Sequence, residues 1–268
     1  MQIRKPNFSP NHSTKAQWFE ANPFKTQLFN AISMSFPFGE GYFIKSFKQI
    51  QNAGLIQDVE LLKKITLFSA QEAMHSSIHL EFNRYLASQG LNFSLANWFE
   101  RRRQFCDIIF DIKTQLSVTM AYEHLTAALA YANLKHGWVN DVQDINIRNM
   151  WNWHSAEEIE HSSVAHELYE AVNGGYCRRI FGMLYALSSF LFDYSIQTTI
   201  NLWKTGDLFK LKTLKGCASF LFGKNGLAWI IGHTSIAYLL PNWKPLNNAD
   251  QLAQDWLRQH SDQFKVIK

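Results

Sequence analysis

The chain has 268 residues, of which 47% are hydrophobic and 15% aromatic, enough for one large core or for a domain with a substantial appendage. Its net charge of +4 is too small and too evenly spread to indicate nucleic-acid binding. Cys106, Cys177 and Cys217 lie far apart without a C-x-x-C pair, which argues against a disulfide framework and a zinc–thiolate site. We therefore expect a cytoplasmic protein, and no apolar run of a signal peptide follows the basic N-terminus.

The first part of the chain predicts an arm followed by two helices. Residues 1–22 are polar and contain prolines, so we expect an irregular surface arm without chemistry. From Pro23 onward, apolar residues recur at steps of three and four, which predicts a helix. Pro37 and Gly39 should interrupt this helix, and a second helix should begin near Phe38.

The middle of the chain shows the same helical periodicity, with caps at the expected places. Asp58 is the expected N-cap of one helix, and either Asp141 or Asp144 is the expected N-cap of another. No stretch of the sequence alternates as a β-strand does. We therefore predict helices at residues 59–88, 106–136 and 142–173, with a shorter connecting helix at 91–105 whose arginines face solvent.

The last third is more apolar. Residues 180–203 and 217–240 are nearly continuous apolar runs flanked by basic residues. Their length would admit membrane spans, but Asp193 and Lys224 interrupt them. We expect buried helices that back the bundle, with a hairpin dipping into a membrane surface as the alternative. A closing amphipathic helix should run from 249 to 264 and dock Leu252, Trp256 and Leu257.

The stretch 153–161 concentrates histidines and glutamates within about two helical turns. On a helix, His154, Glu158 and His161 fall within roughly 60° of one another, which is half of a metal site. The alternative is a solvated acidic helix. Glu157 lies within the same arc, so geometry alone does not choose between Glu157 and Glu158.

The acidic pattern occurs twice along the chain. A lone Glu40 precedes Glu72-x-x-His75, and a lone Glu123 precedes Glu158-x-x-His161, at similar separations. Two helix pairs that each supply one glutamate and one E-x-x-H motif are typical of a ferritin-like dimetal bundle. Several carboxylates offset and bridge two cations, and one imidazole per metal suits iron or manganese better than magnesium or calcium.

The sequence therefore predicts an all-α fold: a ferritin-like four-helix bundle with a dimetal centre and additional C-terminal apolar helices. The predicted parts, which together form one compact domain, are an N-terminal arm at 1–22, the dimetal bundle at 23–175 and C-terminal helices at 176–268 that pack on the bundle.

Four blocks also resemble the bacterial "predicted metal-dependent hydrolase" family of the ferritin-like superfamily. They are Phe36-Pro37-x-Gly39-Glu40, Gln71-Glu72-x-x-His75-x-x-x-His79, Glu123-His124-x-Thr126 and Trp153-His154-x-x-Glu157-Glu158-x-Glu160-His161. The resemblance implies kinship with dimetal-carboxylate halogenases that act on acyl chains. The spacing is also similar to that of diiron arylamine N-oxygenases, which carry an additional histidine one turn before the final E-x-x-H.

The resemblance and the helical spacing together predict seven metal ligands: Glu40, Glu72, His75, Glu123, His154, Glu158 and His161. His154 takes the place of the additional histidine, and the preference for Glu158 over Glu157 rests on spacing and resemblance. His79 is expected to orient a ligand by hydrogen bonding or to replace one. His124, Glu157 and Glu160 are further candidates for such supporting or alternative roles.

Three functions remain open at this stage. The leading hypothesis is an oxidoreductase in which two metal ions, iron or manganese or one of each, use dioxygen and an external electron donor to oxidise, hydroxylate or halogenate a small or acyl-chain substrate. The alternatives are a hydrolase that uses a metal-activated water and a metal-binding protein without catalysis. We expect no nucleic-acid partner, and we note a possible homodimer and a possible peripheral membrane contact through residues 180–240.

Overall fold

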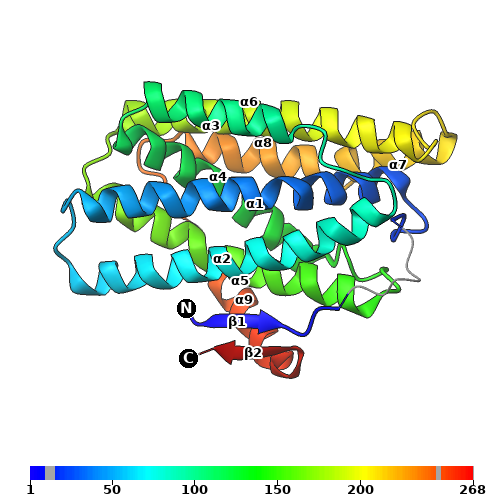
Figure 1. The fold of residues 1–268 in the computed structure, drawn as a ribbon, viewed down its shortest axis with the longest axis horizontal. Coiled ribbons are helices and arrows are strands. Elements are labelled where there is room, and N and C mark those ends of the chain that lie inside the picture. The colour runs from blue at the N-terminus through cyan, green and yellow to red at the C-terminus, as the bar shows by residue number, and fades with distance from the viewer. Residues whose placement is uncertain (10–15, 246–248, 268) are drawn as a thin grey trace.

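The regular structure of the described residues is helical apart from one short two-stranded ribbon, which confirms the all-α prediction (Figure 1). The computed structural model describes residues 1–9, 16–245 and 249–267. Residues 10–15 of the predicted arm lie outside the described part.

Four helices form a closed ring around the centre of the molecule. They are α1 (Pro23–Asn52), α2 (Val59–Ser88), α4 (Ile112–His136) and α5 (Ile145–Ala171). Helix α1 packs on α2 and α4, and α5 packs on the same two helices, so each helix has two neighbours. In the sequence, helix α3 (Ala96–Ile109) lies between α2 and α4, and in the fold it contacts α1.

Helix α1 is continuous through Pro37, so the predicted interruption is wrong. Proline has no N–H and leaves the carbonyl four residues earlier, that of Ser33, without its helical donor. Asn83 on α2 replaces this donor, because its Nδ2 donates to the Ser33 carbonyl oxygen at 2.9 Å. A side chain from the neighbouring helix thus lets α1 continue to Glu40.

The predicted boundary between α3 and α4 also shifts. Residues 106–109 belong to α3, and α4 begins only after Asp111, whose side chain accepts a hydrogen bond from the Thr114 amide. Asp144, rather than Asp141, caps α5 by accepting from the amides of Asn146 and Ile147. Such caps satisfy amides that have no partner within the helix.

The two chain ends form an antiparallel ribbon that the sequence did not predict. Strand β1 (Ile3–Pro6) pairs with β2 (Phe264–Ile267), after α9 (Ala249–Gln259) and a 3₁₀ turn at Ser261–Gln263. The arm is therefore neither wholly irregular nor wholly superficial, since Ile3–Pro6 form a strand that packs against α2 and α5. The predicted closing helix is correspondingly shorter. Four-residue strands are too short to show a reliable alternation.

The helices between residues 176 and 238 pack on the side of the bundle away from the ribbon, whereas α9 lies beside the ribbon (Figure 1). Helix α6 (Tyr176–Lys204) runs along α1 and α4. The predicted 217–240 segment divides at Gly223 into α7 (Leu211–Phe222), which packs on α1, and α8 (Leu227–Tyr238), which packs on α4. The expected full burial is wrong for α6, whose outer face exposes large apolar residues. In the described part of the chain, no helix is long and apolar enough to cross a membrane.

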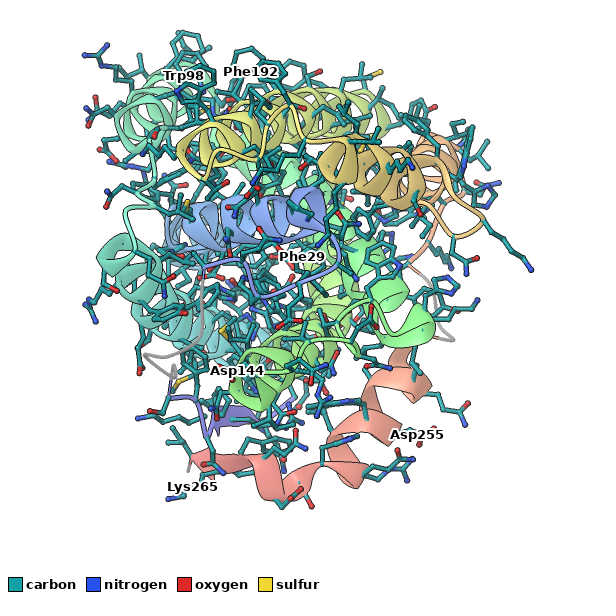
Figure 2. All side chains as sticks on the ribbon, turned by 90° about the vertical axis from the view of Figure 1, so that its right-hand side faces the viewer. Phe29, Trp98, Asp144, Phe192, Asp255 and Lys265 are labelled. Atoms are coloured by element: carbon teal, nitrogen blue, oxygen red, sulfur yellow. The ribbon has the colours of Figure 1, made fainter. Side chains whose placement is uncertain are left out.

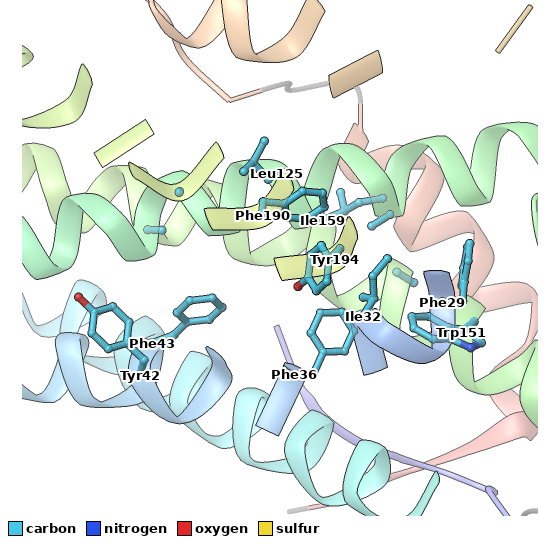
Figure 3. Packing of buried hydrophobic residues seen from close by; sticks show 14 of the residues in the cluster. Phe29, Ile32, Phe36, Tyr42, Phe43, Leu125, Trp151, Ile159, Phe190 and Tyr194 are labelled. Carbon is cyan, nitrogen blue, oxygen red and sulfur yellow. The ribbon is translucent and has the colours of Figure 1, made fainter. Parts of the chain in front are cut away.

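Aromatic packing joins α1, α5 and α6 beside the ring. Figure 3 shows Phe29, Ile32 and Phe36 of α1 together with Trp151 of α5 and Tyr194 of α6. The rings of Phe29 and Trp151 meet edge to face with centroids 4.9 Å apart, a favoured geometry for aromatic pairs. This packing holds α1 in register with α5, and both helices carry predicted ligands.

The continuity of α1 can be tested with Asn83→Ala. Loss of the amide leaves the buried Ser33 carbonyl without a donor, so the free energy of unfolding should fall by about 1–3 kcal/mol. In a Pro37→Ala background the new N–H of residue 37 can donate to that carbonyl. Asn83→Ala should then lower the free energy of unfolding by less. Urea unfolding of the four proteins measures this coupling. An equal cost in both backgrounds would show that Asn83 does not compensate for Pro37.

Candidate metal centre

The structure brings the seven predicted ligands together inside the ring of four helices. Glu40 comes from α1, Glu72 and His75 from α2, and Glu123 from α4. Helix α5 supplies the remaining three, which are His154, Glu158 and His161. Each of the seven residues is at most 3% exposed to solvent.

Two carboxylates lie between two imidazoles at the heart of the site. His161 Nδ1 is 2.6 Å from Glu72 Oε1 and 3.6 Å from Glu158 Oε1. His75 Nδ1 is 3.2 Å from Glu158 Oε1 and 4.0 Å from Glu72 Oε1. The inner nitrogen of each E-x-x-H histidine therefore faces both E-x-x-H glutamates.

The other predicted ligands lie at the two ends of this core. Glu123 Oε2 is 3.8 Å from His161 Nδ1, and His154 Nε2 is 3.1 Å from Glu158 Oε1. Two groups of side chains offer ligand atoms that all lie within 4.8 Å of one another, and they share His75. One group is Glu72, His75, Glu158 and His161, and the other is Glu40, His75 and His154. These buried groups could hold two metal ions.

The seven predicted ligands differ from the neighbouring glutamates and histidines in how completely they are hydrogen bonded. Within the described part of the chain, each of them has at least one buried oxygen or nitrogen atom with no hydrogen-bond partner, and no other glutamate or histidine does. A buried carboxylate without a partner is costly, so such atoms favour the binding of a cation or of water at this place. The atoms are both oxygens of Glu40, Glu72 and Glu123, one oxygen of Glu158, Nδ1 of His75 and His161, and Nε2 of His154.

Glu157 faces away from the core and supports His75. Its Oε2 is 3.0 Å from His75 Nε2, and its Oε1 accepts a hydrogen bond from Arg4 Nη1 at 2.9 Å. Arg4 lies on β1 and is only 7% exposed. The arm that was expected to have no chemistry therefore places a buried guanidinium behind the site.

Arg4 on β1 is also linked to His161, the histidine of the second E-x-x-H motif, through two further side chains. Arg4 Nη1 is also 3.3 Å from Glu160 Oε2, which accepts from Gln71 Nε2 at 3.3 Å. Gln71 Oε1 is 3.3 Å from His161 Nε2. The outer nitrogens of His75 and His161 are thus joined through Glu157, Arg4, Glu160 and Gln71. Sequence reasoning assigned no role to Arg4 or Gln71, and no local pattern marks Arg4.

His154 has a separate supporting chain that contains His79. His154 Nδ1 is 2.9 Å from His79 Nε2, and His79 Nδ1 is 2.8 Å from Ser33 Oγ, which donates to Asn83 Oδ1 at 2.9 Å. Because Asn83 Nδ2 donates to the Ser33 carbonyl, its Oδ1 is the acceptor for the Ser33 hydroxyl. If His154 donates from Nδ1 to His79, then His79 donates to Ser33 and Ser33 donates to Asn83. The Nε2 lone pair of His154 is then free to bind a metal. His79 orients His154 in this arrangement.

His124 is not part of the centre. Its Nε2 lies 3.1 Å from the Thr234 carbonyl oxygen on α8, and its ring packs against Tyr238 and Trp243. Burial lowers its pKa to about 4. His124 therefore joins α4 to the C-terminal helices, and its position beside Glu123 in the sequence does not bring it to the ligands.

Burial and mutual repulsion determine the charges of the apo site. Burial, followed by the charges of Glu72 and Glu158, raises the pKa of Glu123 well above its ordinary value, and burial likewise raises that of Glu40. The pKa of Glu158 is well below its ordinary value, because the surrounding imidazoles outweigh burial. Against burial, the nearby carboxylates of Glu157 and Glu158 raise the pKa of His75 to about 10.

One cavity reaches the centre, and a second cavity lies beside the first. The inner one, of about 40 Å³, is lined by His154 and Glu158 together with apolar side chains, and it has room for a few water molecules. The outer one, of about 80 Å³, lies among α1, α3, α4 and α6. Phe36 and Thr126 line both cavities, so these two residues separate an apolar pocket from a space that reaches two predicted ligands.

Comparison with known proteins agrees with this geometry. A family model described as "Predicted metal-dependent hydrolase" matches residues 2–249. The chain belongs to this family. The predicted metal-dependent hydrolase match covers every residue of the centre, including Arg4 on β1. No match is found among curated proteins or among solved structures.

The protonation of the apo site predicts that metal affinity rises with pH. The raised pKa values of Glu40 and Glu123 keep protons on the folded chain, and a raised pKa keeps His75 charged below about 10. Both effects stabilise the metal-free fold at low pH and are lost as pH rises, whereas ligation requires these protons to leave. Apparent affinity should increase by at least about tenfold per pH unit between pH 6 and 8.

Calorimetric titration in buffers of different ionisation enthalpy would measure the released protons directly. Binding that releases no protons and has the same affinity at pH 6 and pH 8 would contradict this picture of the apo site.

Proposed function

We propose that the centre binds two divalent metal ions and that these seven residues are their ligands. The supporting observation is that the unpartnered buried atoms belong to these residues and to no other glutamate or histidine of the described chain. Glu72 and Glu158 would help to hold both ions, because each lies near both inner imidazole nitrogens. Glu40, His75 and His154 would contribute to one site, and Glu123 and His161 would contribute to the other.

The charges of the side chains support this assignment. Arg4 is hydrogen bonded to Glu157, so that carboxylate already has a cationic partner from the protein. No lysine or arginine of the described chain forms an ion pair with the other four buried carboxylates, Glu40, Glu72, Glu123 and Glu158. Two divalent cations would offset those four charges. The same argument selects Glu158 as a ligand and Glu157 as a support.

We propose hydrolysis as the reaction, in accord with the family description. Two bound metal ions lower the pKa of a bridging water and polarise an ester, amide or phosphoryl oxygen. The chain supplies the rest. Glu157 and Gln71 hold the two E-x-x-H imidazoles in position, and Phe36 stacks on His154 with ring centroids 4.5 Å apart, which limits the access of bulk water.

The cavities indicate an elongated and largely apolar substrate. The outer cavity offers aromatic walls that include Phe38, Phe99 and Tyr194. The inner cavity offers the hydroxyls of Thr126 and Ser155 beside His154 and Glu158. We infer that an apolar chain occupies the outer cavity while its polar reacting end passes Phe36 to reach the metal ions. Small polar substrates would leave the outer cavity unused.

One observation favours oxidation as a second candidate function. The ligand imidazoles are enclosed by aromatic rings: Trp153 lies edge-on to His75 at 4.9 Å and Phe68 edge-on to His161 at 4.8 Å. Apolar enclosure of this kind excludes water and protects reactive intermediates. Iron or manganese would suit the ligands in this role, with dioxygen and an external electron donor as co-reactants.

The ligand assignment predicts different results for two adjacent glutamates. Glu158→Gln should remove at least one of the two metal ions, because it replaces a bridging carboxylate. Glu157→Gln should retain both ions and weaken binding by about 10- to 100-fold, as is typical when a residue that orients a ligand is changed. Metal analysis of the purified variants, with circular dichroism as the folding control, measures both effects. The reverse result would exchange their roles.

The two reactions differ in their need for oxygen. Hydrolysis predicts that the metal-loaded protein cleaves acyl esters of medium chain length under anaerobic conditions without reductant, and that Glu158→Gln lowers kcat/KM by at least about 100-fold. Esters with the shortest chains should be poorer substrates. Cleavage that is absent without oxygen, together with oxygen uptake by the reduced protein, would replace hydrolysis by oxidation.

A further inference from the structure

The outer side of α3, α6 and α7 exposes large apolar side chains. Trp98 on α3 is 47% exposed, Phe192 on α6 is 55% exposed and Trp203 on α6 is 68% exposed. Trp98 and Phe192 are in contact, with ring centroids 6.3 Å apart, and Figure 2 shows them together on the side of the molecule opposite Lys265 of the ribbon. These residues belong to neither cavity.

The exposed residues of α6 lie along one side of the helix. Phe181, Phe192 and Trp203 recur every eleven residues, which returns to nearly the same direction on an α-helix. Leu184 and Leu191 lie on the adjoining stripe and are 54% and 55% exposed. Buried positions such as Phe190 and Tyr194 face the bundle instead. Helix α6 therefore has two apolar sides, and the described part of the chain covers only one of them.

The apolar side chains continue past the end of α6. Phe209, Leu211 and Leu214 are 80%, 65% and 57% exposed. We call the combined surface the outer face, and it consists of Trp98, Phe181, Leu184, Leu191, Phe192, Trp203, Phe209, Leu211 and Leu214. A soluble protein rarely exposes so many large apolar residues on neighbouring elements without a partner.

The segment that carries most of the outer face is positively charged. Residues 176–240 contain seven lysines and arginines but only two acids, a net charge of +5, although the whole chain carries only +4. Both acids are paired, Asp193 with Arg102 and Asp207 with Lys210. Lys204, Lys215 and Lys224 are exposed. The partner of this face should therefore be apolar in its interior and negatively charged at its surface.

We propose that the outer face docks on an anionic lipid bilayer. Its tryptophans, phenylalanines and leucines would enter the boundary between headgroups and acyl chains, while the lysines contact the anionic headgroups. A second copy of the chain fits less well, because two such faces would bring together the lysines of α6 and α7, while both acids of residues 176–240 are already paired. The bilayer provides both the apolar layer and the negative charge.

Docking would also affect the candidate substrate cavity. The inner side of α3 lines the outer cavity through Phe99, Arg102 and Cys106, while the outer side of the same helix carries Trp98. A bilayer against this helix would lie next to a cavity suited to an apolar chain. This consequence rests on the proposed function, whereas docking itself does not.

Flotation of the metal-loaded protein with lipid vesicles tests the proposal without turnover. Binding is expected to phosphatidylcholine vesicles that contain about one third phosphatidylglycerol, and to be at least about tenfold weaker without the anionic lipid or in high salt. Phe192→Ser/Trp203→Ser should weaken binding by at least about tenfold. The matched control Val59→Ser/Leu80→Ser, which alters exposed apolar residues of α2, should leave binding unchanged.

A pair of charge variants keeps the test valid if the serine variant folds poorly. Lys204→Glu/Lys215→Glu should reduce binding by at least about tenfold, and Lys63→Glu/Lys265→Glu should not. Circular dichroism and melting temperature check the fold of each variant. Three results would overturn the proposal: no binding to anionic vesicles, equal binding to neutral vesicles, or a stable dimer in solution that Phe192→Ser/Trp203→Ser dissociates.

Discussion

Four carboxylates that form no ion pair with a lysine or arginine of the described chain, buried in the centre of a helical bundle, are the feature on which the rest of the structure depends. Glu40, Glu72, Glu123 and Glu158 meet where solvent does not reach them. A charged group in such a place must be neutralised by protons or offset by cations. The histidines beside them provide part of this charge. Two metal ions would offset it fully, which is why we regard the bundle as a scaffold for a dimetal centre.

The shell around these carboxylates gives each imidazole its own support. His75 contacts Glu157, His161 contacts Gln71, and His154 contacts His79. Each contact uses the ring nitrogen that faces away from the carboxylates, so the inner nitrogen is directed toward them. Part of this shell depends on the N-terminal strand, because Arg4 holds Glu157. The ribbon formed by the two chain ends therefore contributes to the site as well as to the fold.

The sequence predicted the centre better than its surroundings. The placement of predicted ligands such as Glu72 and His75 on one side of a helix follows from helical periodicity, because residues three apart share a helix face. The role of Arg4 could not be predicted, since it depends on the pairing of β1 with the far end of the chain. The continuity of α1 through Pro37 depends on Asn83 of another helix. Local patterns do not record such contacts between distant segments.

The exposed side of α6 illustrates the same limit. Its sequence is apolar on nearly all sides, which predicts burial, yet only the residues that face α1 and α4 are covered. Composition cannot tell whether the other side is covered by the same chain or by a different partner. The three-dimensional arrangement shows which residues of α6 remain uncovered, and these residues belong to the outer face, whose segment 176–240 carries a net charge of +5.

Anomalous X-ray scattering from crystals of the metal-loaded protein tests the central claim most directly. The account predicts two peaks inside the ring of α1, α2, α4 and α5, with Glu72 and Glu158 each contacting both. His75 should bind one ion and His161 the other. A single peak, or metal bound only outside this ring, would contradict the dimetal centre.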